Sequence, residues 1–234
     1  MQTIQQTKGL KFPDEFVIKY FFKENLHRRR GRVLELGCGN GNNLMLFFQY
    51  GWDCVGIDYN EQSIGDAVYN FGQVPTSGNR FSFIQHDLQS GLPSALETCD
   101  VLLLPNVLYY IPRLAAITCL EQAADLVTPG GGVFLRLRSP RDYRYRRGRE
   151  VEPNGFILDI SETGENGALM VFYEEYELVE MLRNSMGIEP ASLRLMRVTY
   201  DNLQNGCLVR NDEIVIWGEL TGAGGRSQDS VARK

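Results

Sequence analysis

Apolar segments of strand length alternate with segments of helix length over the first 137 residues, and this alternation constrains the fold more than any other feature. The apolar runs lack polar alternation, most clearly at residues 101–104 (VLLL), which is typical of strands buried on both faces. Buried strands that alternate with helices form a parallel sheet covered by helices on both sides. The expected strands are residues 32–36, 53–57, 81–85, 100–104 and 133–137. The expected helices are residues 42–50, residues 60–71 and a segment with the apolar face Leu114, Ile117, Leu120, Ala124 and Val127.

The pattern changes after residue 138. Residues 139–175 contain two prolines, four glycines and many charges without a clear period. Irregular segments of this length usually serve function or are disordered, so we expect an insertion that caps the substrate. A helix is expected at residues 176–186, followed by two strands joined through Asn205-Gly206, a residue pair typical of tight hairpin turns. The expected organisation is one domain over residues 1–221 and a small, polar, disordered tail over residues 222–234.

The composition indicates a soluble globular protein, with 43% hydrophobic and 23% charged residues. The formal net charge of -5 argues against a nucleic acid as partner. No apolar run approaches the ~20 residues that span a bilayer, and residues 1–11 lack the apolar core of a signal peptide. None of the five cysteines forms a C-x-x-C pair and only two histidines are present, so we expect free thiols, a cytoplasmic location and no metal site. A homodimer is left open.

A glycine-rich turn joins the first expected strand to the first expected helix. Gly37, Gly39 and Gly41 allow backbone conformations closed to other residues and let a ligand approach the main chain and the helix N-terminus. Asp58 ends the second strand, 21 residues after Gly37, where a carboxylate can accept hydrogen bonds from both ribose hydroxyls of an adenosine ligand. The alternative is that Asp58 only caps the next helix.

Two details of this turn distinguish dinucleotides from S-adenosylmethionine (SAM). Asn42 occupies the sixth position of the G-x-G-x-x-G fingerprint, where dinucleotide-binding turns need glycine. Glu35 lies two residues before the first glycine, where it would repel a diphosphate and suit the cationic methionine portion of SAM. These residues disfavour an NAD-dependent oxidoreductase.

The segment E-L-G-C-G-N-G resembles the first motif of class I SAM-dependent methyltransferases, and further similarities follow in the family's order over residues 12–220. Q-H-D-L at residues 85–88 is similar to the third motif, residues 104–110 to the loop after strand four, and P-G-G-G-V-F-L to the start of strand five. The resemblance implies an enzyme with a doubly wound, seven-stranded α/β sheet of order 3-2-1-4-5-7-6 whose last strand is antiparallel. It also implies SAM as cofactor and S-adenosylhomocysteine (SAH) as product. The implied cofactor-binding residues are Glu35, Gly37, Cys38, Gly39, Asn40, Gly41, Asp58, Tyr59, Asp87 (at the adenine amino group), Leu88 and Asn106.

Methyl transfer depends mainly on alignment of the acceptor, although a hydroxyl or ammonium acceptor also needs a base. The loop after the fourth strand reads L-P-N-V-L-Y-Y-I and lacks the N-P-P-Y pattern of nucleic-acid amino-methyltransferases. Tyr109, Tyr110 and His86 are the candidate catalytic residues. Their alternatives are aromatic packing for the two tyrosines and a structural, hydrogen-bonded role for the histidine.

Residues 136–149 hold seven of the nineteen arginines and begin at the carboxyl end of the fifth strand, where open parallel sheets bind ligands. Arg138, Arg141 and Arg144 are therefore candidates to hold an anionic acceptor. The alternative is a solvated loop, or pairing with the nearby acids Glu150, Glu152, Asp159 and Glu162.

The sequence thus predicts a SAM-dependent methyltransferase that acts on oxygen or nitrogen of a small molecule, with an anionic acceptor as one option. RNA or protein methylation is a second reading. A third is a non-catalytic interaction protein with a SAM-binding fold, although it would not need Glu35, Asp58 and Asp87 together.

Overall fold

The computed structural model describes residues 6–220. Its main sheet has seven strands in the order β3-β2-β1-β4-β5-β10-β9. β10 pairs antiparallel with β5 and with β9, and the other pairings are parallel. This confirms the predicted α/β fold and strand order. The strands are β1 Arg32–Leu36, β2 Asp53–Asp58, β3 Phe81–Gln85, β4 Cys99–Pro105, β5 Val127–Arg138, β9 Arg194–Gln204 and β10 Cys207–Glu219.

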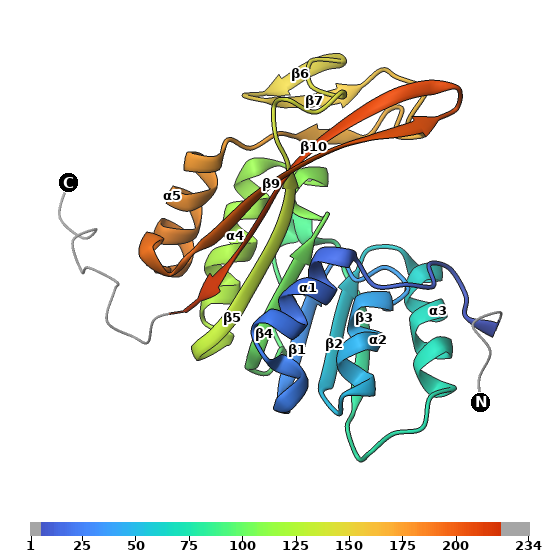
Figure 1. Ribbon diagram of the computed structural model, residues 1–234, viewed down its shortest axis with the longest axis vertical. Coiled ribbons are helices and arrows are strands. Elements are labelled where there is room, and N and C mark those ends of the chain that lie inside the picture. Colours follow the sequence, from blue (N-terminus) through green and yellow to red (C-terminus); the bar gives the residue numbers. More distant parts are fainter. Residues whose placement is uncertain (1–5, 221–234) are drawn as a thin grey trace.

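Helices cover both faces of this sheet (Figure 1). Because side chains alternate along a strand, neighbouring residues of β1 and β4 enter opposite layers. Val33 and Leu103 pack with the aromatic residues of α1 and α2, whereas Leu34 and Leu102 pack with α4 and α5. The helices are α1 Glu15–Lys23, α2 Asn42–Gln49, α3 Glu61–Gly72, α4 Arg113–Ala124 and α5 Glu175–Met186.

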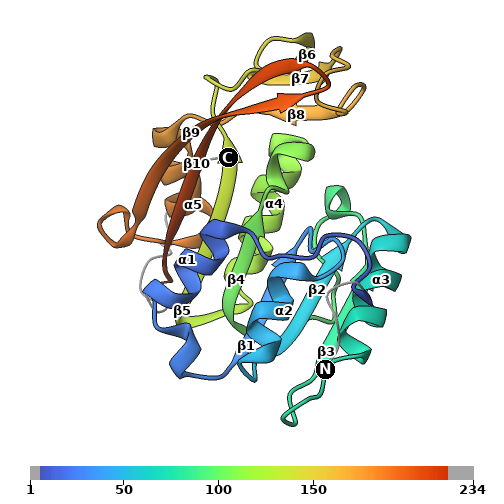
Figure 2. The same ribbon diagram turned by 45° about the vertical axis from the view of Figure 1, so that its right-hand side comes forward.

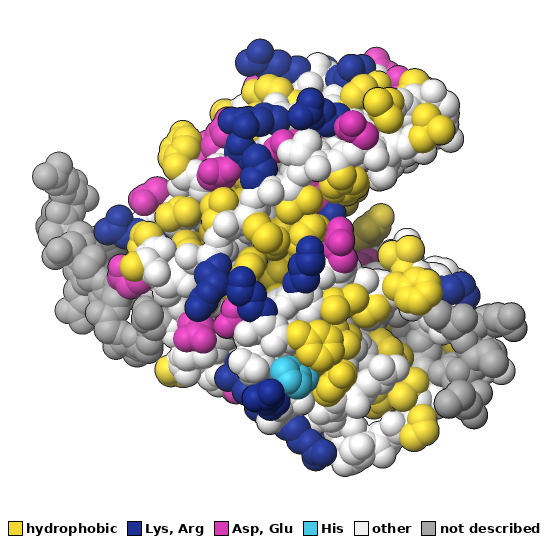
Figure 3. All heavy atoms as spheres, viewed as in Figure 1, with side chains coloured by type: hydrophobic (Ala, Val, Ile, Leu, Met, Phe, Trp, Pro, Cys, Tyr) yellow, Lys and Arg dark blue, Asp and Glu magenta, His cyan; other side chains and the backbone are white. Residues whose placement is uncertain are grey.

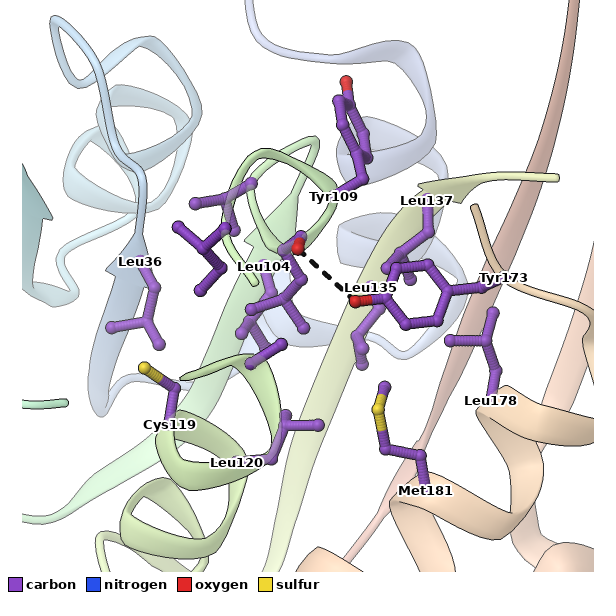
Figure 4. Packing of buried hydrophobic residues seen from close by; sticks show 14 of the residues in the cluster. Leu36, Leu104, Tyr109, Cys119, Leu120, Leu135, Leu137, Tyr173, Leu178 and Met181 are labelled. Carbon is purple, nitrogen blue, oxygen red and sulfur yellow. Dashed lines mark hydrogen bonds between the residues drawn. The ribbon is translucent and has the colours of Figure 1, made fainter. Parts of the chain in front are cut away.

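The layer on the α4 and α5 side extends to the edge of the site. Figure 4 shows Leu178 and Met181 of α5 beside Leu135 and Leu137 of β5. Tyr173, just before α5, donates a hydrogen bond from its hydroxyl to the Leu108 carbonyl at 3.4 Å. The segment that returns from the insertion is thereby fixed to the loop that follows β4.

Residues 139–175 contain a small antiparallel sheet of order β6-β7-β8, where the sequence suggested an irregular stretch. Its strands are β6 Gly148–Glu152, β7 Gly155–Leu158 and β8 Leu169–Val171. Each has only three to five residues, too few for a periodic signal in the sequence. This sheet lies beyond the carboxyl end of β5, beside the far end of the β9–β10 hairpin (Figures 1 and 2).

The β9–β10 hairpin turns at Asn205-Gly206, as predicted. Both residues have positive φ, 46° and 82°, which a tight turn between antiparallel strands requires. The hairpin also supports the insertion, because the Tyr143 amide donates to the Arg210 carbonyl at 2.9 Å. The Asn205 side chain donates to the Glu162 carbonyl at 2.8 Å.

Two elements differ from the sequence prediction. Helix α1 was not predicted; it buries Phe16, Val17, Tyr20 and Phe21 against β5 and β10 and begins at the N-cap Asp14. β5 begins at Val127, before the glycines, because Val127 pairs with Cys99 across an irregularity in the β4 register. Val127 therefore belongs to the sheet and the helix before it ends at Ala124. The predicted disordered tail at residues 222–234 lies outside the described residues.

Among residues 6–220, no helix is both long and apolar enough to cross a membrane.

Truncation of a central core side chain tests this layered arrangement. Leu103 lies on β4 with 0% of its surface exposed, and Leu103→Ala should lower the free energy of unfolding by about 2–5 kcal/mol. Leu203, 76% exposed on the hairpin, is the matched control. Leu203→Ala should change the free energy of unfolding by at most about 0.5 kcal/mol. Urea titration of both variants checks the contrast, and equal effects would contradict the assignment of the core.

Candidate ligand site

A cavity of about 540 Å³ lies at the carboxyl ends of β1, β2 and β4. Open parallel sheets bind ligands at this edge. Figure 3 shows a deep notch between the lobe that carries β6–β8 and the lobe that carries α2 and α3. The cavity is lined by Gly37, Asp58, Tyr59, His86, Asp87, Leu88, Gln89, Asn106, Val107, Tyr110, Ile111, Gly164, Glu165, Ala168 and Leu169. Of the predicted cofactor-binding residues, Gly37, Asp58, Tyr59, Asp87, Leu88 and Asn106 are brought together here.

The glycine turn is tied to the end of β2. The amides of Gly37 and Cys38 both donate to the Ile57 carbonyl, at 2.8 and 3.0 Å. Gly37 has a φ of 71°, and a Cβ there would lie 2.4 Å from Cγ2 of Val107, so a larger residue does not fit. Around Gly39, by contrast, no atom lies within 4 Å of such a Cβ, so the turn leaves open space beside its main chain.

Asp58 is held in place by two backbone amides. Its Oδ2 accepts from the Gly39 amide and its Oδ1 from the Asn60 amide, both at 2.9 Å. Asn60 is the N-cap of α3, and its side chain accepts from the Ser63 amide at 2.9 Å. Asp58 is therefore not the cap of this helix. Each of its oxygens retains acceptor capacity towards the cavity, which suits a ligand with two adjacent hydroxyls.

A short 3-10 helix, η3 (Leu88–Ser90), forms the wall after β3. Asp87 caps it by accepting from the Gln89 amide at 2.9 Å, and its carboxylate is exposed at the cavity. The Nε2 of His86 lies 2.9 Å from the Gly91 carbonyl and 3.3 Å from Oγ of Ser90. These contacts give His86 a structural role in this wall, although the residue also lines the cavity.

Glu35 is fully buried beside the turn rather than in the cavity lining. Its Oε1 accepts from Nδ2 of Asn43 at 2.7 Å, while its Oε2 has no hydrogen-bond partner among the described residues. Burial raises the pKa of Glu35 to about 8, the Asn43 hydrogen bond opposes this shift, and the charges of Asp14 and Asp58 reinforce it. A buried acceptor without a partner is costly. The unpaired Oε2 therefore fits a hydrogen-bonding group bound at the turn, and a cationic group there would favour the ionised form of Glu35.

The remaining turn residues hold the N-terminal segment in place. Nδ2 of Asn40 donates to the carbonyls of Lys8 and Leu10 at 2.6 and 2.7 Å, and Nδ2 of Asn42 to the Phe12 carbonyl at 2.5 Å. Cys38 is buried behind the turn, with its Sγ directed to the Gly39 carbonyl. Cys38, Gly39, Asn40 and Gly41 lie outside the cavity lining. The predicted cofactor contacts of these residues, like those of the residues that line the cavity, remain predictions.

The loop after β4 separates the two predicted tyrosines. Tyr110 ends the 3-10 helix η4 (Leu108–Tyr110) and lines the cavity. Burial, with Tyr109 and Glu165 nearby, raises the pKa of the Tyr110 hydroxyl, which is therefore a donor at neutral pH. Tyr109 is buried behind it, donating to Oδ1 of Asn106 at 3.3 Å and packing below the Arg138 guanidinium. Tyr109 fits its packing alternative better than a role at the reacting atoms.

The arginines at the end of β5 form a buried cluster with acids. Arg136 binds Asp14 and Glu213, and Arg138 binds Asp142 and Glu213. Arg144, 2% exposed, binds Asp142 and Glu165. Arg141 is exposed. The structure thus favours the paired alternative for Arg138 and Arg144, with partners different from the acids expected. Asp142 lies within four residues of both arginines, whereas Glu165 is 21 residues from Arg144 and Glu213 is 75 residues from Arg138. None of the three predicted acceptor-binding arginines lines the cavity.

Glu165 is the charged residue of the cavity lining that sequence reasoning did not identify. It lies between β7 and β8, so the insertion brings it to the cavity from 55 residues beyond Tyr110. Its Oε1 accepts from the Tyr110 hydroxyl at 2.9 Å and its Oε2 from Nε of Arg144. Residues 161–168 carry no motif that would have singled it out. Among residues 6–220, no group of His, Cys, Asp or Glu is arranged to hold a metal ion.

Comparisons with known proteins agree with this geometry. The family described as "Methyltransferase domain" matches residues 11–185. A tRNA N(3)-methylcytidine methyltransferase of Schizosaccharomyces pombe is 24% identical over 73% of this chain and 69% of its own length. A ubiquinone biosynthesis O-methyltransferase of Stutzerimonas stutzeri is 28% identical over 49% of this chain, which spans about half of that enzyme (48%).

Solved structures share the fold. A SAM-dependent methyltransferase from Methanosarcina mazei matches with a TM-score of 0.64 at 17% identity, covering 86% of this chain and 97% of its own. A second is the 1,6-didemethyltoxoflavin-N1-methyltransferase of Burkholderia thailandensis, solved with 1,6-didemethyltoxoflavin and SAH bound. It matches with a TM-score of 0.56 at 17% identity and covers 88% of this chain and 77% of its own.

Protonation of Glu35 gives a testable dependence of stability on pH. In the folded protein this carboxyl stays protonated up to about pH 8, whereas in the unfolded chain it ionises near its ordinary value of 4.5. The unfolded state therefore loses its proton first, and the stability contributed by protonated Glu35 is lost as pH rises between these values, by at most about 1.4 kcal/mol per pH unit. Glu35→Gln removes this loss, so the free energy of unfolding of the variant should rise relative to that of wild type between pH 5 and pH 8.

Urea titration at both pH values measures the difference. Glu189→Gln, at an exposed position, is the control and should track wild type at each pH. A Glu35→Gln difference that is the same at pH 5 and pH 8 would contradict the raised pKa.

Proposed function

We propose that this chain methylates an oxygen or nitrogen of a small molecule. The chain belongs to the methyltransferase-domain family and is a class I methyltransferase that uses SAM. The observation that carries the proposal is the shared cavity. The residues assigned to the cofactor and those of the insertion line the same cavity of about 540 Å³. This volume lies in the range of small-molecule and cofactor sites.

The residues suggest a division of the cavity. We assign Asp58 to the two ribose hydroxyls and Asp87 to the adenine amino group, with open space beside the main chain at Gly39 for close approach of the ligand. When bound, the sulfonium of SAM supplies an activated methyl group. The protein then has to position the acceptor, and a well-aligned arrangement can supply much of the rate acceleration.

Tyr110 and Glu165 face the acceptor side in this assignment, because the loop after β4 and the insertion meet there. Tyr109 supports Tyr110 through a tilted ring contact, with ring centroids 4.5 Å apart. An anionic acceptor would require Arg138, Arg141 or Arg144 to reach the cavity, and the ion pairs of Arg138 and Arg144 weigh against this role. A cytoplasmic location and a homodimer stay predictions.

RNA methylation is the second candidate. The match to a tRNA methyltransferase supports it. So do four exposed arginines at the start of the insertion, Arg141, Arg146, Arg147 and Arg149, which could contact phosphates. The negative net charge and the absence of Lys and Arg among the described residues that line the cavity favour a small acceptor.

An activity measurement distinguishes these candidates. The protein is incubated with SAM carrying a labelled methyl group and, separately, with a metabolite extract, total RNA and a protein lysate. We expect label to appear in the metabolite fraction below 1 kDa. Label that appears only in RNA or protein would overturn the proposal.

Substitution of Asp58 tests the cofactor assignment. Asp58→Ala removes a charged acceptor for two hydroxyls. One hydrogen bond to a charged group contributes about 1.5–3 kcal/mol, so the affinity for SAH should fall by at least roughly ten- to a hundredfold. Glu61→Ala, three residues further on at an exposed position, should leave the affinity unchanged. Calorimetric titration with SAH measures both variants. An unchanged Kd in a folded Asp58→Ala protein would remove Asp58 from the site.

A further inference from the structure

The charge of the cavity is negative at its acceptor side. Three carboxylates line the cavity, from Asp58, Asp87 and Glu165, and among the described lining residues there is no Lys or Arg. Asp58 and Asp87 belong to the β2 and β3 side that we assign to adenosine. Glu165, delivered by the insertion, is the carboxylate left for the acceptor.

The carboxylate of Glu165 is oriented from two directions. Oε1 accepts from the Tyr110 hydroxyl at 2.9 Å, and Oε2 accepts from Nε of Arg144. Arg144 is itself fixed by Asp142 and Asn211, through bonds of 3.0 and 3.1 Å. Each carboxylate oxygen can accept a second hydrogen bond, and the side chain remains 16% exposed. Glu165 is therefore a preorganised acceptor with unused capacity at the cavity wall.

The arginines behind Glu165 do not reverse this charge. Arg136, Arg138 and Arg144 are in contact with four carboxylates, those of Asp14, Asp142, Glu165 and Glu213. The cluster therefore carries no surplus positive charge to attract an anion. A carboxylate or phosphate in the acceptor position would instead approach Glu165, and two buried like charges repel strongly.

We propose that the acceptor is a neutral or cationic molecule with an N–H or O–H donor, and that Glu165 is the specificity-determining residue that accepts this hydrogen bond. The ring of Tyr110 and the apolar side chains of Ile111 and Leu169 form the adjoining wall. The inference rests on the proposed function and replaces the anionic acceptor that the arginine-rich segment suggested. If Glu165 instead only anchors the insertion to Tyr110, its substitution will weaken the fold without changing the preference among acceptors.

Three para-substituted phenols of nearly equal size serve as probes: tyramine (cationic), tyrosol (neutral) and 4-hydroxyphenylacetate (anionic). Their binding to the full chain saturated with SAH is measured by ligand-observed NMR. In wild type, tyramine should bind more tightly than tyrosol, and both should bind at least about tenfold more tightly than 4-hydroxyphenylacetate. Each tenfold step corresponds to about 1.4 kcal/mol.

Variants assign this preference to Glu165. In Glu165→Gln, tyramine should lose about tenfold in affinity and its advantage over tyrosol, while the Kd for SAH stays within twofold. Glu150→Gln, at an exposed position on β6 of the same insertion, is the matched control and should bind all three probes as wild type does. Tyr110→Phe keeps Glu165 and frees its Oε1, so it should retain the preference for tyramine even if Glu165→Gln fails to fold.

The inference would be overturned if 4-hydroxyphenylacetate bound most tightly, or if none of the three phenols bound. It would also be overturned if the tyramine affinity were unchanged in Glu165→Gln, or if Tyr110→Phe lost the preference for tyramine. These outcomes are separate from failure of the proposed function. That failure appears as label transferred only to RNA or protein, whichever phenol binds.

Discussion

The pairing of Arg136 and Arg138 with Glu213 is the interaction on which the insertion and the β9–β10 hairpin depend. The two arginines lie on one face of β5, and Glu213 lies opposite Arg138 in the antiparallel register with β10. Buried charges are tolerated only when they are paired and hydrogen-bonded. The sheet can therefore continue past its apolar core at this edge only because two distant strands supply opposite charges.

Three other parts of the chain attach to this pairing. Asp14, the N-cap of α1, binds Arg136 and so fixes the helix that precedes the glycine turn. Asp142 and Arg144 bring the start of the insertion to Arg138, and Glu165 connects that cluster to Tyr110. A continuous series of ion pairs and hydrogen bonds thus connects α1 to Tyr110 and Glu165 in the cavity wall. Because removal of one member would leave another charge buried and unpaired, the cluster gives the two sides of the cavity a fixed relative position.

The sequence was sufficient for the parts of the fold that repeat a short-range rule. Uninterrupted apolar strands, the glycine turn and Asn205-Gly206 each determine local structure, and the strand order followed from the resemblance to the family. Asp58 could be placed because it directly follows a predicted strand, and Asp87 because Q-H-D-L resembles a family motif. Glu165 and Glu213 could not, because their importance comes from pairing with residues 21 and 75 positions away across an insertion without periodicity. The seven clustered arginines suggested an anion site for the same reason: the sequence shows their charges but not the acids that neutralise them.

The insertion leaves and rejoins the sheet at one point, since the Tyr173 amide donates to the Arg138 carbonyl at 3.0 Å. Residues 139–172 therefore form a closed excursion whose two ends are already adjacent in the underlying fold. The entropy of closing such a loop grows only slowly with its length, by about 0.6 kcal/mol for each doubling. A change in the length of this excursion is consequently tolerated by the sheet that holds Asp58 and the glycine turn, provided that Asp142, Arg144 and Glu165 keep their ion pairs. The other residues of the excursion can therefore vary while the cofactor side stays unchanged.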